Sequence, residues 1–224
     1  MRGHWLQRTG QADCILFMAG WGMAPAPFAT IPCHGHDLLM LYDYRDLEVP
    51  DLSPLKNYRQ CHLIAWSMGV WAASLLPAPV RSRFAQATAM GGTLHPMDDR
   101  LGIPVAAFDA TVKALDSDAL AAFHRSMFDE EEETERFLAH APRRSAGELR
   151  SELAGLRAAC RRQGPGRDIF TLRIITSRDR IVPARNQLRA WGRTATVTRR
   201  WPHFPFYRIP AWHTLLREDA VDRK

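Results

Sequence analysis

The segment HLIAWSMGVWAA at residues 62–73 decides how the rest of the sequence is interpreted. Residues 62–66 form an apolar run suited to a buried strand, and the small and apolar residues that follow favour a helix. Ser67 stands at the junction, where a strand that turns sharply into a helix lifts a hydroxyl above the sheet. Gly69 relieves crowding after the serine, whereas Ala65 replaces the first glycine of the G-x-S-x-G pattern. The segment predicts a nucleophilic serine; the structural alternative is that Ser67 only caps the helix.

Five more apolar runs of strand length occur on either side of this segment. They lie at residues 14–19, 37–43, 84–90, 170–176 and 195–198. These runs are short and continuous, and helical segments separate several of them, which is typical of a parallel sheet covered on both faces. The sequence therefore predicts an α/β fold, with a mostly parallel sheet flanked by helices and right-handed crossovers.

The alternation of strands and helices stops between residues 103 and 165, where the pattern is helical. Helices are predicted at residues 116–128, 130–140 and 145–162. The last of them carries an apolar stripe at helical spacing, formed by Leu149, Leu153, Leu156 and Cys160. We expect residues 1–102 and 166–224 to form the core, and residues 103–165 to form a helical lid inserted before the fifth predicted strand.

The composition fits one ordinary globular domain. The chain has 224 residues, of which 46% are hydrophobic and 24% are charged, so it can bury a core without a disulfide scaffold. Its four cysteines form no CxxC pair, which favours a reducing compartment, and Cys14 and Cys61 lie in apolar runs. Neither a secretory signal nor an apolar stretch near the roughly 18 residues of a membrane span is found. We expect a cytoplasmic monomer that does not bind a membrane.

The net charge of +6 is unevenly distributed. Residues 1–135 carry 10 basic and 17 acidic side chains, whereas residues 136–200 carry 16 arginines and 4 acidic side chains. A basic region on an otherwise acidic chain predicts a docking surface for an anionic partner, either nucleic acid, a phosphorylated metabolite or an acidic protein. The alternative is arginine used in place of lysine on a solvated surface. The sequence contains no nucleic-acid-binding motif, so we expect no nucleic acid partner.

Two later segments complete a candidate catalytic set. Asp179 lies in IITSRDRIVP, just after a predicted strand, and His203 lies in WPHFPF, after the last one. The order Ser67, Asp179, His203 is that of the α/β-hydrolases, in which the aspartate orients the imidazole. Asp179 could instead cap a helix or lie in a turn. His213 is the rival histidine, and we favour His203 because His213 lies in a terminal helical stretch.

A glycine-flanked turn, FMAGWGM at residues 17–23, ends the first strong strand. Such a turn can aim the N–H of Trp21 into the site, where it would form an oxyanion hole with the N–H of Met68. The alternative is an ordinary glycine turn.

Other polar residues have simpler interpretations. The CHGH segment at residues 33–36 lacks a second ligand pair at a matching spacing, so we expect no metal. Asp43 and Asp46 are predicted to be surface turn residues, and the acidic run at residues 129–133 is predicted to be a solvated helix start.

Four segments together resemble a known family. They are AGWGM at residues 19–23, YDYRDL at 42–47, AWSMGVWAA at 65–73 and HFPF at 203–206. This set is similar to the BioG type of pimeloyl-(acyl-carrier protein) methyl ester esterase, an α/β-hydrolase of biotin synthesis, and the resemblance runs from about residue 14 to 213. It implies that Ser67 is the nucleophile, His203 the general base and Asp179 its orienting partner, with Trp21 and Met68 supplying the oxyanion N–H groups. The implied reaction releases methanol and needs no cofactor.

The resemblance also implies a partner, the acidic acyl-carrier protein that carries the substrate. Arginines of the predicted lid could pair with its carboxylates and phosphate. The candidates are Arg143, Arg144, Arg150, Arg157, Arg161 and Arg162. A general short-chain carboxylesterase or thioesterase would use the same triad, and a catalytically inactive α/β-hydrolase serving as a binding module is a further alternative.

Overall fold

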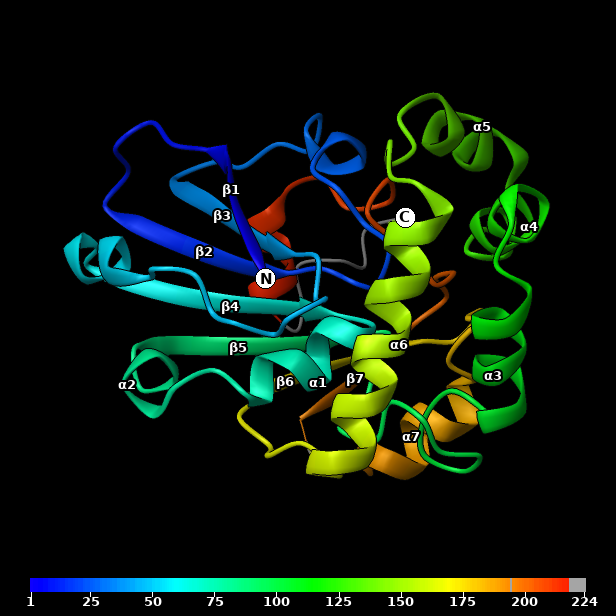
Figure 1. The fold of residues 1–224 in the computed structure, drawn as a ribbon. Helices are drawn as coiled ribbons and strands as arrows, with labels where there is room; N and C mark the ends of the chain where they lie inside the picture. Colours follow the sequence, from blue (N-terminus) through cyan, green and yellow to red (C-terminus); the bar gives the residue numbers. More distant parts are fainter. Residues whose placement is uncertain (194, 218–224) are drawn as a thin grey trace.

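The computed structural model describes residues 1–193 and 195–217, and in this part of the chain seven strands form one sheet (Figure 1). The strands are β1 (Arg2–Gln7), β2 (Asp13–Met18), β3 (His36–Tyr42), β4 (Gln60–Trp66), β5 (Phe84–Met90), β6 (Leu172–Thr176) and β7 (Thr196–Arg199). Their order across the sheet is β1-β3-β2-β4-β5-β6-β7. Every neighbouring pair is parallel except β1 and β3, which are antiparallel. The predicted α/β class with a mostly parallel sheet is therefore confirmed.

All six predicted strands are present, and β1 is an addition at the sheet edge. The central strands β2 and β4 are buried on both faces, as their continuous apolar runs require. Strand β1 instead mixes polar and apolar residues in the sequence RGHWLQ, and its first three residues are exposed. It pairs with only one neighbour, so it can keep its polar side chains in solvent.

The described helices comprise seven α-helices and three 3₁₀-helices. Between β5 and β6 lie four of them, α3 (Val105–Ala114), α4 (Ser117–Ser126), α5 (Glu131–Ala139) and α6 (Ala146–Gln163). The others are η1 (Ala26–Phe28), η2 (Ser53–Asn57), α1 (Met68–Ser74), α2 (Ala78–Arg81), α7 (Ala184–Trp191) and η3 (Trp212–Leu216). None of the helices in the described ranges combines the length and the apolar character needed to cross a membrane.

The three predicted helices of the insertion correspond to α4, α5 and α6, and α3 was not predicted. Figure 1 shows α3, α4 and α5 beyond the carboxyl ends of the strands. Helix α6 begins with a capping box in which the Ser145 hydroxyl accepts from the Glu148 N–H, and the Glu148 carboxylate accepts from the Ser145 N–H. Its predicted apolar stripe is buried against the core, from Leu149 to Cys160. The sequence motif therefore sets both the start of this helix and the face that it packs.

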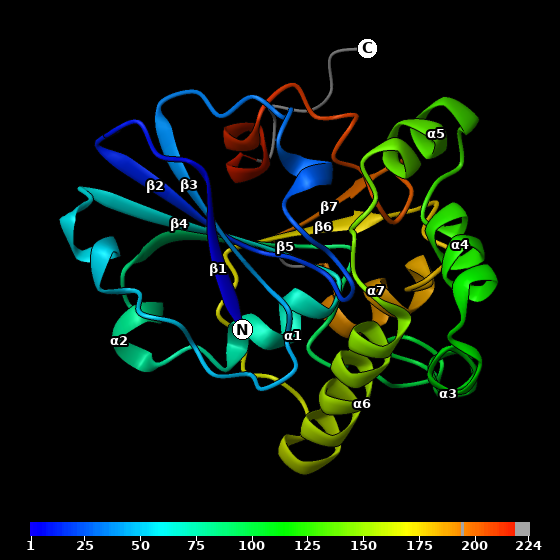
Figure 2. The same cartoon turned by 45° about the horizontal axis from the view of Figure 1, so that its top comes forward.

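Side chains of the sheet divide between two hydrophobic layers. Leu16 and Leu63 point into the layer that includes α1 and α6, whereas Phe17 and Ile64 point into the opposite, aromatic layer. Figure 2 shows α1, α2 and α6 on one side of the sheet, and η1 and η3 on the other. Two-sided burial holds the carboxyl ends of the strands in fixed positions beneath the inserted helices.

Helix α1 crosses the end of β2 so closely that only glycine fits at position 69. A Cβ atom there would lie 2.3 Å from the carbonyl oxygen of Met18 and 2.5 Å from that of Ala19. Both contacts are with backbone, which cannot rotate away as a side chain can.

The replacement Gly69→Ala is expected to lower the free energy of unfolding by at least about 2 kcal/mol, because the helix must move off the sheet. Gly147→Ala in α6 is the matched control, since the nearest neighbour of the added Cβ would be the Ser145 hydroxyl at 3.9 Å. This control should raise stability by about 0.5–1 kcal/mol through helix propensity. Urea titrations of both variants test the difference, and equal midpoints would contradict it.

Candidate active site

Ser67 lies on the sharp turn between β4 and α1, in a backbone conformation that side chains rarely adopt. Its φ is 56° and its ψ is −128°, and such a conformation persists only where the surroundings impose it. Gly92 passes so close that a Cβ atom there would lie 2.3 Å from the carbonyl oxygen of Ser67. The hydroxyl therefore projects from a strained corner instead of capping α1, for which no side-chain cap bond is made.

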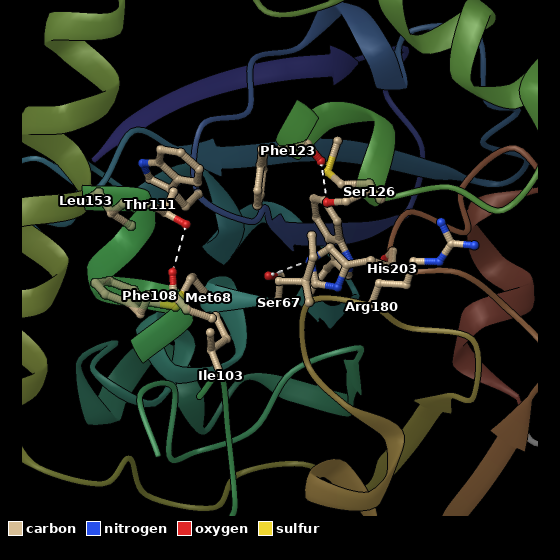
Figure 3. Close-up of a pocket in the computed structure, with 15 residues that line it drawn as sticks. Ser67, Met68, Ile103, Phe108, Thr111, Phe123, Ser126, Leu153, Arg180 and His203 are labelled. Carbon is tan, nitrogen blue, oxygen red and sulfur yellow. Dashed lines mark hydrogen bonds between the residues drawn. The ribbon is translucent and has the colours of Figure 1, made fainter. Parts of the chain in front are cut away.

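The structure brings Ser67, His203 and Asp179 together, and Figure 3 shows the first two of these side chains facing each other. The Nε2 atom of His203 lies 3.0 Å from the Ser67 hydroxyl, and its Nδ1 atom lies 2.8 Å from Oδ2 of Asp179. All three residues are more than nine-tenths buried. When the Nδ1–H of His203 donates its hydrogen bond to the Asp179 carboxylate, the Nε2 lone pair is left directed at the serine hydroxyl.

The Asp179 carboxylate is held by donors on both oxygens. Oδ1 accepts the backbone N–H groups of Ile181 and Val182, each at 2.8 Å. Oδ2 accepts the Thr176 hydroxyl at 2.8 Å and the Gln187 amide at 3.2 Å, besides His203. A carboxylate with this many donors has a fixed orientation, so it can hold the imidazole in one tautomer and one plane.

His213 lies in η3 and does not face Ser67. Its ring lies 6.2 Å from that of His34 and 6.5 Å from that of His36, the first residue of β3. The amino end of that parallel strand is opposite the edge that carries Ser67. Although residues 33–36 lie near His213, the described residues include no group of three side chains arranged to hold a metal ion.

The N–H groups of Trp21 and Met68 belong to segments that border the serine. Met68 is the first residue of α1, so its N–H has no partner within the helix and lies at the positive end of the helix dipole. The Trp21 segment is held from two sides: the Tyr44 hydroxyl donates to Ala19 O at 2.6 Å, and the Trp21 indole donates to Leu149 O at 3.0 Å. Both segments are thus braced where developing negative charge would need a donor.

An apolar cavity of about 210 Å³ opens on Ser67 and His203. Its walls come largely from the inserted helices and include Ala107, Phe108, Thr111, Phe123, Ser126, Met127 and Leu153. The hydroxyls of Thr111 and Ser126 donate to carbonyls of their own helices (Figure 3), so both are already satisfied. Arg180 lines the edge of the cavity. The interior suits an aliphatic chain rather than a charged group.

The six candidate arginines separate into two groups. Arg144, Arg150 and Arg157 are used within the fold: Arg150 donates to Leu115 O and Arg157 pairs with Asp109 of α3 at 2.7 Å. Arg143, Arg161 and Arg162 are exposed, and their side chains make no hydrogen bond or ion pair to another described residue. The guanidinium groups of the second group are therefore fully available for an external anion.

Arg144 is the most enclosed of the six and forms a buried charge cluster with Asp43 and Glu152. Its guanidinium lies 2.6 Å from Glu152 Oε2 and 3.1 Å from Asp43 Oδ1, and the Glu152 side chain is fully buried. Burial raises the pKa of Asp43, but the bond from Arg45 and the charge of Arg144 outweigh it and hold that pKa below its usual value. For Glu152, burial dominates and raises the pKa. The prediction that Asp43 is a surface residue is wrong, because its charge is matched by an arginine about 100 residues away.

Asp129 forms a second charge cluster, which the sequence did not predict. The prediction of a solvated run holds for Glu131 and Glu132, which are exposed, but the Asp129 side chain is only 7% exposed. It accepts from Arg178 at 2.7 Å and also from Arg208. Arg178 adjoins Asp179, so this cluster ties the inserted helices to the loop that carries Asp179. No local pattern signals it, since its partners lie about 50 and 80 residues away in the sequence.

Comparison with known proteins gives a family match over nearly the whole chain. The model of a family described as "Pimeloyl-ACP methyl esterase BioG" matches residues 1–215. A crystal structure of BioG from Haemophilus influenzae has 32% sequence identity and a TM-score of 0.87, and the match covers 97% of this chain and 100% of that one. An uncharacterized protein of Haemophilus influenzae is 36% identical over 206 residues, which cover 90% of this chain and 93% of that protein.

Two other matches are informative in different ways. A malonyl-(acyl-carrier protein) O-methyltransferase of Bacteroides fragilis is 35% identical over 189 residues, or 84% of this chain, yet the match spans only 38% of that protein. The enol-lactonase of Burkholderia xenovorans has 15% identity and a TM-score of 0.59, with 90% of this chain and 88% of that chain covered. The second likeness concerns the fold alone, which is that of the α/β-hydrolases.

The Asp129 cluster generates a pH-dependent stability prediction. Burial raises the pKa of Asp129, but the bonds from Arg178 and Arg208 outweigh it and leave that pKa lowered in the folded chain. A lowered folded pKa stabilises the protein above the unfolded value of about 4, and this contribution is lost as the pH falls through the folded value. Asp129→Asn should therefore cost about 2 kcal/mol at pH 7, and less at pH 3.

Unfolding measured with urea at both pH values tests this expectation. Glu132→Gln is the matched control, because Glu132 belongs to the same acidic run but is exposed. The control should change stability by less than about 0.5 kcal/mol at either pH. A cost for Asp129→Asn that is the same at pH 3 as at pH 7 would contradict the ion-pair account.

Proposed function

The chain belongs to the BioG family of pimeloyl-ACP methyl esterases, and from this premise we propose that it hydrolyses pimeloyl-(acyl-carrier protein) methyl ester to pimeloyl-(acyl-carrier protein) and methanol in biotin synthesis. The observation that carries the proposal is the hydrogen-bonded array of Ser67, His203 and Asp179 at the sharp turn after β4. Family membership supports a hydrolase, and the array supports a serine esterase among the reactions that a hydrolase could perform.

Acylation begins when His203 Nε2 takes the Ser67 proton while the serine oxygen bonds to the ester carbonyl carbon. The carbonyl electron pair moves onto its oxygen, and the N–H groups of Trp21 and Met68 stabilise this oxyanion. When the carbonyl re-forms, the bond to the methoxy oxygen breaks. That oxygen takes the proton from His203, and methanol leaves an acyl-enzyme on Ser67.

Deacylation repeats these steps with water. His203 Nε2 takes a proton from water as the water oxygen bonds to the acyl carbon, and the Ser67 oxygen then leaves with that proton. The product is the free carboxylate, so one water is consumed for each methanol released. Asp179 keeps the Nδ1 proton directed toward itself throughout, and stabilises the imidazolium that forms twice in the cycle.

Two observations support an aliphatic, methylated and carrier-bound substrate. The cavity beside Ser67 is apolar and its wall hydroxyls are satisfied, so it favours a methylene chain capped by a neutral ester over a free carboxylate. In the Bacteroides fragilis relative, a segment like this chain is part of a longer protein named as a methyltransferase of malonyl-(acyl-carrier protein). Joining the two parts is sensible if one removes the methyl group that the other attaches.

The partner in this proposal is the acyl-carrier protein, and the four helices between β5 and β6 act as a lid. Arg143, Arg161 and Arg162 are exposed on or beside α6 and have no internal partner among the described residues. Guanidinium groups pair well with carboxylates and phosphate, the charges that a carrier protein and its prosthetic arm present. Such pairs chiefly raise the rate of association and weaken with added salt.

Alanine replacement of Ser67 or His203 is expected to lower methanol release from the carrier-bound methyl ester by at least about 10³-fold, because each atom is needed for attack. The matched control is Ser82→Ala, a serine after α2 whose hydroxyl donates to Pro79 O; it should keep its activity. A panel with nitrophenyl esters and acyl thioesters separates the general esterase and thioesterase alternatives. A Ser67→Ala protein that still releases methanol would refute the proposal, and one that retains an undiminished biological role would favour a binding module.

The docking role predicts a charge-dependent KM. The double change Arg161→Glu and Arg162→Glu should raise KM for the carrier-bound ester about 10-fold at low salt, with kcat unchanged, and this difference should shrink with added sodium chloride. Lys56→Glu in η2 is the control, since it alters an exposed charge before β4, at the opposite end of the sheet. Equal KM effects of the two changes, or no salt dependence, would contradict docking at α6.

A further inference from the structure

A second, much smaller cavity adjoins the large one at Ser67. Its volume is about 10 Å³, against about 210 Å³ for the large cavity, so it has room for a single water-sized group. Ser67, Met68 and Ile103 line both cavities, so the two cavities meet at the same serine. The rest of the small cavity is walled by Gly92, Thr93, Pro96, Gly102 and Val182.

The carbonyl carbon of an ester carries two organic arms, the acyl chain and the alkoxy group. A chain of several carbons fits only the large cavity, which leaves the small one for the alkoxy group. We infer that the small cavity is the binding subsite for the alkyl part of the leaving alcohol, and that its size admits methyl and rejects longer alkyl groups. This inference rests on the proposed function, since it assigns the alcohol side of the ester named there.

Backbone forms part of the wall, and backbone cannot be displaced by a larger alkyl group. At Gly92 even an added Cβ would lie 2.3 Å from the Ser67 carbonyl oxygen, and at Gly102 it would lie 1.7 Å from the His95 carbonyl oxygen. The fully buried Asn186 side chain donates to Gly102 O at 2.8 Å, which clamps this loop against α7. The wall on this side is packed as tightly as a protein core.

Hydrogen bonds fix two other wall residues, Val182 and Thr93, and those of Val182 also hold Asp179 and Gln187. Val182 is buried, its N–H donates to Asp179 Oδ1 at 2.8 Å, and its carbonyl accepts from Gln187 Nε2 at 2.7 Å. Thr93 is 2% exposed, and its hydroxyl accepts from the His95 N–H at 3.1 Å. With these side chains in place, a group larger than methyl would have to displace the loop that carries Asp179.

The position of His203 agrees with the assignment of the acyl chain to the large cavity and of the alkyl group to the small one. His203 lines the large cavity and not the small one, so the alkoxy oxygen would lie within reach of Nε2 while its methyl group points away from the imidazole. After proton transfer, methanol is free to leave. An alcohol with a longer alkyl group does not fit without displacing the Asp179 loop. Selectivity for the methyl ester then follows from shape alone.

The test compares methyl, ethyl and n-propyl esters of the same carrier-bound seven-carbon acyl chain. For the unaltered protein, kcat/KM should fall at least about 10-fold from methyl to ethyl and further to propyl, which is the range that one methylene in a tight apolar pocket produces. Hydrolysis of all three esters at rates within about twofold would overturn the inference and leave the proposed function standing. Failure to hydrolyse any of them would instead refute the proposed function.

Two neighbouring residues provide a matched pair of variants. Val182 lines the small cavity and Ile181 lines the large one. Val182→Ala should raise the ethyl-to-methyl ratio of kcat/KM about 10-fold, whereas Ile181→Ala should leave that ratio unchanged. Val182→Ile should lower methyl ester hydrolysis by filling the subsite. Equal shifts of the ratio in the two alanine variants would overturn the assignment.

A fourth variant, at another position of the wall, shows whether loss of folding explains the results at Val182. Thr93→Ser keeps the hydroxyl that the His95 N–H needs and removes only a methyl group from the wall. It should raise the ethyl-to-methyl ratio in the same direction as Val182→Ala, with a melting temperature close to that of the unaltered protein. A ratio that does not move in this folded variant would count against the subsite.

Discussion

Close backbone packing holds the turn at Ser67 in one conformation, and the site depends on this constraint. The serine has a φ of 56°, and two other segments press on the turn: residues 18–20 lie against Trp66, Ser67 and Gly69, and Gly92 lies against the Ser67 carbonyl. A side chain at Gly69 or Gly92 would meet carbonyl oxygens at 2.3 Å. The strain of the turn is thus balanced by two-sided packing of the sheet, and its effect is to fix one hydroxyl at the end of β4.

The rest of the array is held by bonds that converge from distant parts of the chain. The Trp66 indole, one residue before the serine, donates to the carbonyl of His203 at 2.7 Å, so the end of β4 positions the histidine loop directly. Asp179 is fixed by donors on both carboxylate oxygens, and the Asp129 carboxylate binds both Arg178 and Arg208. Opening the inserted helices would therefore involve the same ion pairs that steady the Asp179 loop.

The sequence was most informative where a pattern is local. Continuous apolar runs identified six strands, and the sharp turn at Ser67 was predicted from the strand, the serine and Gly69 alone. Strand β1 was missed because RGHWLQ is half polar, which only an edge position tolerates. Helix α3 was missed because VAAFDATVKA has no strong polar face and no side chain that caps its start, and only Phe108 in it is buried.

Long-range electrostatics could not be foreseen from spacing. Arg144 and Asp43 lie about 100 residues apart, so neither their ion pair nor the burial of Asp43 is written in a motif. For the same reason, six arginines of one basic segment could not be sorted into packing and exposed groups. The small cavity arises where residues 92–103 meet the Asp179 loop, and its size depends on backbone contacts that no sequence pattern records.

The central claim is that the strained serine is the nucleophile and that His203 activates it. Labelling with an alkyl phosphonate ester that carries a good leaving group, followed by peptide mass spectrometry, tests this most directly, because such reagents bond only to an activated hydroxyl. The account predicts one label per chain, on Ser67, and almost none in a folded His203→Ala variant. Labelling of another residue, or labelling of Ser67 at an undiminished rate without His203, would contradict it.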